Sequence, residues 1–202
     1  QAYLPVHDTP PERRVKHAQG LRNGQYTNAF GEENSLEWQY NWVAQMGWVW
    51  SISFPLIAIR DMADDDDEFE RILKIVFATA GKNSFIDPFA REGLRNWLDI
   101  PREIGDNDPR VMGAYIQAIL GCQLVPYEFE AFDADGVEIR VDQETFTGRF
   151  EMAPLDEITL GYEAQWNGAC HTLVSPEWSV WIDEDDDDFI INVGRKVDDR
   201  AL

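Results

Sequence analysis

The hydrophobic period of this chain changes from helical to alternating near Gly121, and that change constrains the fold more than any other feature. Before Gly121, apolar residues recur every three or four positions, as they do along amphipathic helices, for example at Val111, Met112, Tyr115, Ile116, Ile119 and Leu120. After it, apolar and charged residues alternate, which is typical of strands with one buried face. Helices followed by antiparallel strands predict an α+β fold, in which N-terminal helices cover one face of an antiparallel sheet.

The alternating segments predict two hairpins and one further strand. The first hairpin joins Tyr127–Ala131 to Val137–Val141 through Asp135-Gly136, a dipeptide that favours a tight turn. The second joins strands on either side of the acidic run Asp183–Asp188. We also expect a strand over Thr145–Met152. Two hairpins and this strand supply enough strands for one sheet.

Acidic residues cluster in two runs, Asp64–Asp67 and Asp183–Asp188. The first run precedes an apolar period of helical type, where acids complement the positive end of the helix dipole. It lacks the glycine and terminal glutamate of a calcium-binding loop. We therefore expect both runs to be solvated, and we expect no metal site.

One long helix, Ile158–Val174, is predicted between the two hairpins. Asp156 and Glu157 precede it, and the Ser175-Pro176 dipeptide ends it, because the residue before a proline avoids the helical conformation. Its apolar residues recur at helical spacing and include Tyr162 and Trp166. Beside them lie an acid, an amide, a thiol and an imidazole at Glu163, Asn167, Cys170 and His171.

These four polar side chains are the candidate catalytic residues. Glu163 suits general acid–base catalysis if burial raises its pKa, and Asn167 suits the orientation of a carbonyl or an oxyanion. Cys170 suits nucleophilic attack, but only as a thiolate. His171 is the next residue after Cys170, so on a helix the two side chains point about 100° apart. A Cys–His pair would therefore need His7 or His17.

A second helix, Leu36–Ile59, is predicted to be aromatic on most sides and therefore buried. We expect Trp42 and Trp48 from this helix, with Tyr162 and Trp166, to line an apolar substrate pocket. Residues 1–33 are polar and rich in turn signals, which indicates an extended arm, followed by a single domain over 34–202. The many apolar faces of Leu36–Ile59 and the arm predict a homodimer or a higher homo-oligomer.

Composition excludes several classes of function. The chain has 202 residues, 44% of them hydrophobic, and a formal net charge of −21. A charge of this sign repels nucleic acid and anionic lipid, so we expect neither as a partner. The uncharged stretch Trp38–Ile59 contains too many polar residues for a membrane span. No dinucleotide, P-loop, zinc or serine-hydrolase motif is present, so we expect no cofactor. Residues 1–30 show no signal-peptide pattern, and we expect a cytoplasmic protein.

A resemblance to a known family begins at about Asp108. It rests on Tyr162-Glu163-Ala164-Gln165-Trp166-Asn167-Gly168-Ala169-Cys170, then a proline-containing connector, then the acidic turn ending in Asp188-Phe189-Ile190-Ile191. In this layout the chain resembles the L-2-amino-thiazoline-4-carboxylic acid hydrolase-like proteins. The resemblance implies hydrolysis of a small cyclic substrate at a C–N bond. Family members often carry further cysteines, where this chain has Phe150–Pro154 and Asp188–Ile190.

Three functional hypotheses follow from the sequence. The first is a small-molecule enzyme with an apolar, aromatic-lined pocket, either a hydrolase of a cyclic C–N bond or a cofactor-independent lyase or isomerase. The second is a non-catalytic protein that binds a hydrophobic or aromatic ligand, for which eight tryptophans supply rings. The third is a structural subunit whose aromatic helix forms an interface.

Overall fold

The computed structural model describes residues 25–27, 33–35, 51–123, 125–147 and 154–195. The chain divides into two compact units, 1–47 and 48–202, whereas the sequence suggested a division after residue 33. Within the first unit, β1 (Gln25–Thr27) and β2 (Glu33–Ser35) pair as a short antiparallel hairpin. The candidate residues that the structure describes belong to the second unit.

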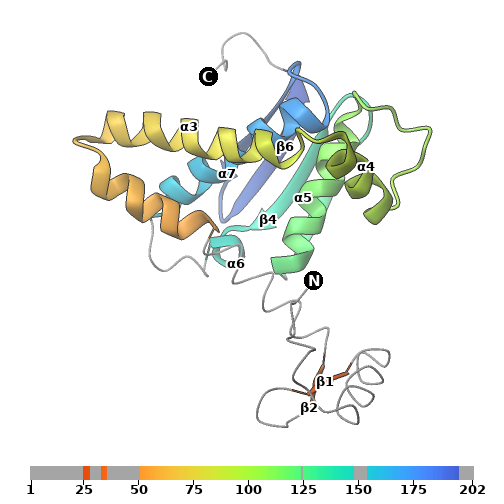
Figure 1. Ribbon diagram of the computed structural model, residues 1–202, viewed down its shortest axis with the longest axis horizontal. Coiled ribbons are helices and arrows are strands. Elements are labelled where there is room, and N and C mark those ends of the chain that lie inside the picture. Colours follow the sequence, from red (N-terminus) through yellow and green to blue (C-terminus); the bar gives the residue numbers. More distant parts are fainter. Residues whose placement is uncertain (1–24, 28–32, 36–50, 124, 148–153, 196–202) are drawn as a thin grey trace, which may run out of the picture. The chain divides into compact units, whose positions relative to one another are not determined.

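The helices of the second unit come mostly before its first strand (Figure 1). Residues 51–62 are helical, and the helix continues through Pro55. It is followed by α3 (Asp66–Ser84), α4 (Pro88–Trp97) and α5 (Pro109–Gln123). The predicted helix Leu36–Ile59 is therefore helical over its described part, while residues 36–50 lie outside the described residues. No helix in the described ranges is long and apolar enough to cross a membrane.

Four antiparallel strands follow, in the spatial order β3-β4-β6-β5. They are β3 (Tyr127–Phe132), β4 (Val137–Asp142), β5 (Trp178–Asp185) and β6 (Asp188–Arg195). Both predicted hairpins are confirmed, and the pairing of β4 with β6 joins them into one sheet. The α+β fold is thus confirmed, with β3 and β5 as the edge strands.

The second hairpin turns at Asp186-Asp187, between the paired residues Asp185 and Asp188. Asp186 has a φ of 54°, a left-handed conformation that aspartate tolerates better than most residues. Arg140 on β4 binds the carboxylates of Asp185 and Asp188, at 2.8 and 2.9 Å. The acidic run therefore has a structural explanation, because it makes a tight turn that is tied to the neighbouring strand.

One expectation about this half of the chain was wrong. The segment predicted as the strand Thr145–Met152 begins as the short helix α6 (Gln143–Thr147), and residues 148–153 lie outside the described residues. The side chain of Asp142 accepts hydrogen bonds from both the backbone N–H and the hydroxyl of Thr145. This cap starts a helical turn directly after β4 and overrides the strand preference of the threonine- and phenylalanine-rich residues that follow.

The two longest described helices, α3 and α7 (Leu155–Leu173), pack against each other with their backbones in close approach. A Cβ atom on Gly168 would lie 2.0 Å from the carbonyl oxygen of Ala78, and one on Gly81 would lie 1.9 Å from that of Gln165. Only glycine fits at such distances, so these two residues set the separation of the helices. Asp65 caps the N-terminus of α3 by accepting a hydrogen bond from the N–H of Glu68, at 2.8 Å.

Helix α7 also packs on the sheet, so that it is covered by α3 on one side and by strands on the other (Figure 1). The inner face of the sheet is apolar and buried, with Val137, Ile139 and Val141 on β4 beside Phe189, Ile191 and Val193 on β6. Helix α5 packs against the same sheet. The core therefore lies between the sheet and the pair α5 and α7, and every polar side chain on the inner faces of α7 must find a partner inside the protein.

Candidate functional site

The predicted late helix is confirmed as α7, and it carries the candidate catalytic residues. Its buried residues are spread around most of its circumference, since one side meets α3 and the other meets the sheet. Asn167 is 8% exposed and Cys170 is fully buried, while Glu163 and His171 are half-buried. We call Glu163, Asn167, Cys170 and His171 the polar stripe. It faces the interior of the protein over much of its length.

Asn167 forms a clamp on the backbone of strand β5. Its side-chain amide donates to the carbonyl oxygen of Val180 at 2.5 Å, and its carbonyl oxygen accepts from the N–H of Val180 at 2.9 Å. The same amide nitrogen also donates to the backbone carbonyl of Glu163 at 3.0 Å. An asparagine that pairs with both backbone groups of one residue takes the place of a neighbouring strand.

Glu163 makes a similar contact one step along the strand. Its carboxylate accepts a hydrogen bond from the N–H of Ile182 at 2.6 Å. Val180 and Ile182 are two residues apart, so their backbone groups point to the same side of β5. That side faces away from β6, because β5 is an edge strand. Glu163 and Asn167 thus cover an edge that would otherwise expose unpaired backbone groups.

An arginine such as Arg140 or Arg149 would be the simplest partner for a half-buried carboxylate like that of Glu163. Arg140 binds Glu130, Asp185 and Asp188, and these contacts raise the pKa of its guanidinium. Arg149 lies outside the described residues. The carboxylate of Glu163 is instead bound by the backbone N–H of Ile182.

Cys170 lies in the hydrophobic core, with no exposed surface. Burial raises the pKa of its thiol to about 12, because the thiolate would lose its hydration. At neutral pH the residue is therefore a protonated, apolar side chain and lacks the thiolate that nucleophilic attack requires. His171 follows it in the last turn of α7. The structure brings Cys170 and Asn167 onto the same buried helix but gives neither of them a solvent-facing position.

Aromatic rings form a compact layer beside the polar stripe. The ring centroids of Tyr162 and Trp166 are 4.8 Å apart, and Phe146 of α6 lies 4.9 Å from Tyr162 and 6.4 Å from Trp166. Phe189 on β6 lies 5.9 Å from Phe146. We call Phe146, Tyr162, Trp166 and Phe189 the aromatic layer. The two expected rings from the N-terminal helix, Trp42 and Trp48, lie outside the described residues.

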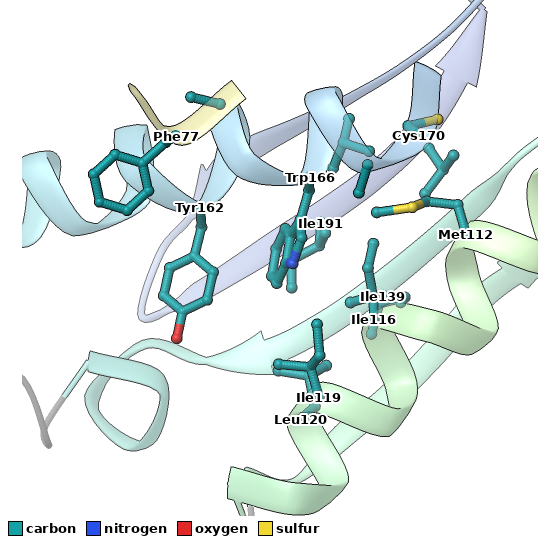
Figure 2. Close-up of a cluster of buried hydrophobic side chains, with 14 of the residues drawn as sticks. Phe77, Met112, Ile116, Ile119, Leu120, Ile139, Tyr162, Trp166, Cys170 and Ile191 are labelled. Carbon is teal, nitrogen blue, oxygen red and sulfur yellow. The ribbon is translucent and has the colours of Figure 1, made fainter. Parts of the chain in front are cut away.

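The aromatic layer faces aliphatic side chains of α5 and β4. Figure 2 shows Tyr162 and Trp166 on the side of α7 that faces Ile116, Ile119, Leu120 and Ile139, with Phe77 of α3 near Tyr162. The hydroxyl of Tyr162 accepts a hydrogen bond at 2.9 Å from the side-chain amide of Gln123, a buried residue at the end of α5. Sequence reasoning missed Phe146 and Gln123, because one was placed in a strand and the other closes a helix with no apparent role.

Trp166 carries the one polar atom of the aromatic layer that has no partner in the described part of the chain. Its ring is fully buried, and its indole N–H makes no hydrogen bond. Leaving a buried donor unpaired costs about 1–3 kcal/mol, so native proteins rarely retain one without a reason. This orphaned donor is the best indication of a ligand position within the described residues.

The described residues include no group of three or more histidine, cysteine, aspartate or glutamate side chains placed to hold a metal ion. No protein-family model, curated protein or solved structure matches this chain. Any functional conclusion therefore rests on the contacts of its own residues.

Proposed function

We propose that this protein binds a small, largely apolar molecule against the aromatic layer of α7, through a hydrogen bond donated by Trp166. The observation that supports this proposal is the buried, unpaired indole N–H. The remaining surroundings are aromatic rings and the aliphatic side chains of α5 and β4, which suit a flat, apolar ligand. The ligand supplies the missing acceptor.

The chemistry around Trp166 narrows the ligand further. An anionic group buried among apolar side chains needs a paired cation, since burial of an isolated charge costs many kcal/mol. The aromatic layer and the aliphatic side chains that face it contain no cationic residue. A neutral acceptor, such as a ketone, amide or ether oxygen on an aromatic or polycyclic skeleton, fits this environment. Carboxylates and phosphates fit it poorly.

Binding without turnover is better supported than the enzymatic hypotheses. Hydrolysis of a cyclic C–N bond, as the family resemblance implied, needs a nucleophile or a general acid–base group at the substrate. Burial keeps the Cys170 thiol protonated, and Glu163 and Asn167 are engaged with the backbone of β5. These contacts favour a structural role for the polar stripe. The expectation of a homo-oligomer stands beside this proposal and does not depend on it.

The test uses a matched pair of probes, 2-acetylnaphthalene and 2-ethylnaphthalene, which share a skeleton and differ in one acceptor oxygen. Dissociation constants are measured by isothermal titration calorimetry on the full chain and on Trp166→Phe, which keeps an aromatic ring and removes the N–H. We expect the wild-type protein to prefer the ketone by about five- to tenfold, the usual net value of one hydrogen bond. The Phe variant should bind both probes alike.

Two results would contradict the proposal. Failure of the wild-type protein to bind either probe at millimolar concentration removes a site for apolar ligands of this size. A ketone preference that persists in Trp166→Phe shows that another residue supplies the donor. The buried Trp178 serves as a control, because its N–H already donates to the carbonyl oxygen of Asn107 at 3.1 Å. Trp178→Phe should therefore leave the ketone preference unchanged.

A further inference from the structure

The sheet has two edge strands, and the described residues cover only one of them. Asn167 and Glu163 bind the backbone N–H groups of Val180 and Ile182, which closes the outer edge of β5. At the opposite edge, β3 pairs with β4 on one side only. Within the described residues, no hydrogen bond reaches the backbone groups on its other side. Such a row of unpaired N–H and C=O groups is a template on which an extended peptide can add a further strand.

The two faces of β3 differ in their chemistry. Glu128 is paired with Arg140 of β4 and therefore lies on the outer face of the sheet, away from the helices. The inner face carries an aromatic row, in which the ring centroids of Tyr127 and Phe129 are 5.6 Å apart and those of Phe129 and Phe132 are 4.7 Å apart. Phe132 joins this row because a β-bulge after Phe129 shifts the register. It is still 42% exposed, so a further strand has apolar surface to cover there.

The outer face beside this edge carries an excess of negative charge. Arg140 already binds three carboxylates. Glu128 and Glu138 are exposed, and no cation of the described part of the chain forms an ion pair with either of them. A strand added to β3 would therefore meet uncompensated carboxylates on its outer face and aromatic rings on its inner face.

Charge disfavours a second copy of β3 as the added strand. Directly opposite residues of an antiparallel pair share a face of the sheet, so two paired β3 strands would bring their outer glutamates together. Like charges in opposite positions are destabilising, and each chain carries a net charge of −21. The same glutamates favour a strand whose outer residues are lysine or arginine.

We propose that the open edge of β3 binds an extended basic segment of another protein by strand addition. Lysine or arginine at every second residue of that segment pairs with Glu128 and the neighbouring carboxylates, while the apolar residues between them cover Phe132. The backbone hydrogen bonds supply affinity, and the alternating side chains supply specificity. Since β3 has six residues, a segment of similar length matches it. This inference does not depend on ligand binding at Trp166.

The test uses two fluorescently labelled heptapeptides of identical composition with the full chain. Lys-Val-Lys-Val-Lys-Val-Lys puts lysines on one face of a strand and valines on the other, whereas Lys-Lys-Val-Val-Val-Lys-Lys does not. Both peptides carry the same charge, so non-specific attraction to an acidic chain is matched. Fluorescence anisotropy at about 0.05 M NaCl, where charge pairs are weakly screened, measures the dissociation constants. We expect the alternating peptide to bind at least about tenfold more tightly.

Variants of single glutamates test the position of the charge. Glu128→Gln should raise the dissociation constant of the alternating peptide by about two- to fivefold, the usual value of one cross-strand charge pair. Glu128→Lys should raise it further, because repulsion replaces attraction. Glu184→Gln is the matched control, since Glu184 is an exposed glutamate on β5 and its loss changes the net charge equally. It should leave the dissociation constant unchanged.

Amide hydrogen exchange measured by nuclear magnetic resonance locates the bound peptide. In the free chain, the amides of β3 that point away from β4 should exchange rapidly, and a saturating concentration of the alternating peptide should slow them by at least about tenfold. The amides of Val180 and Ile182 are the internal control, because Asn167 and Glu163 already bind them. Their exchange should not change.

Four outcomes would overturn the proposal. Equal binding of the two heptapeptides shows that net charge alone attracts them. If Glu184→Gln weakens binding as much as Glu128→Gln, the peptide binds at another surface. Saturating peptide that leaves the β3 amides unprotected excludes strand addition. Protection of β3 that grows with protein concentration in the absence of peptide assigns this edge to a second copy of the chain.

Discussion

Replacement of Asn167 by alanine tests the role of the clamp on β5. The substitution removes the side-chain partners of both the N–H and the carbonyl oxygen of Val180, a residue that is 1% exposed. An unpaired buried backbone group costs about 1–3 kcal/mol, so the loss of two partners should lower the free energy of unfolding by about 2–4 kcal/mol. This loss is large, because the whole free energy of unfolding of a typical domain is only about 5–15 kcal/mol.

The measurement is urea denaturation followed by far-ultraviolet circular dichroism, with the slope of the transition fitted separately for each variant. A loss of this size moves the midpoint by about 1–2 M. Asn83→Ala is the matched control, because Asn83 is exposed on α3 and the same atoms are removed there. If the free energy of unfolding of Asn167→Ala stays within about 0.5 kcal/mol of the wild-type value, water replaces the amide, and Asn167 is not needed to cover the edge of β5.

Asn167→Asp separates hydrogen bonding from packing, because the shape is conserved and only protonation changes. A protonated carboxyl can donate to the carbonyl of Val180 and accept from its N–H, whereas a carboxylate would face that carbonyl without a donor. The pKa of this new aspartate should therefore be raised in the folded state above its unfolded value of about 3.9.

The sign of the effect on stability follows from linkage. A raised folded pKa gives stability that is fully present below about pH 4 and is lost as the pH rises through the folded pKa. Asn167→Asp should thus be more stable than Asn167→Ala at pH 4 and less stable at pH 7. If the difference in free energy of unfolding between Asn167→Asp and Asn167→Ala stays the same from pH 4 to pH 7, the new carboxyl group does not face the Val180 carbonyl.

Three further predictions concern other parts of the molecule. Burial raises the pKa of the Cys170 thiol from 9.0 to about 12, so the stability that its burial contributes should be complete below pH 9 and fall between pH 9 and 12. Iodoacetamide at pH 8 should label Cys170 only after unfolding, and peptide mass spectrometry measures the labelled fraction. Gly168→Ala should destabilise the fold by about 3 kcal/mol or more in urea titrations, because its Cβ would overlap the α3 backbone. Arg140→Met should lower the melting temperature more at low salt than at high salt, because it frees the carboxylates at the β5–β6 turn; calcium should restore no more stability than sodium chloride at matched ionic strength.

The hydrophobic period was sufficient to predict the two hairpins, the late helix and the fold class. In β4, every second residue is buried and the residues between them are charged and more exposed, a pattern that the sequence shows directly. The period could not predict α6, because its start depends on one capping contact between Asp142 and Thr145. The local strand preference of Thr145 and Phe146 pointed the other way.

The sequence placed Glu163 and Asn167 on one side of a helix, and the structure confirms that position. It could not reveal their partners, since both side chains bind backbone atoms of β5, and backbone atoms are the same at every residue. The sequence favoured burial of Cys170 but did not decide it against a reactive position. A thiol within a mixed polar and apolar stripe can face solvent or core, and the choice depends on where α3 and α5 pack.

The packing of α3 on α7 links these observations. Gly81 and Gly168 allow the two helix backbones to touch, which leaves α7 covered by α3 on one side and by the sheet on the other. A helix in that position has little solvent to satisfy its polar groups, so each must be paired within the protein. Glu163 and Asn167 are paired with β5, and Tyr162 with Gln123. The indole N–H of Trp166 is buried on the same helix but has no such partner in the part of the chain that the structure describes, and this unpaired donor is what supports a ligand beside α7.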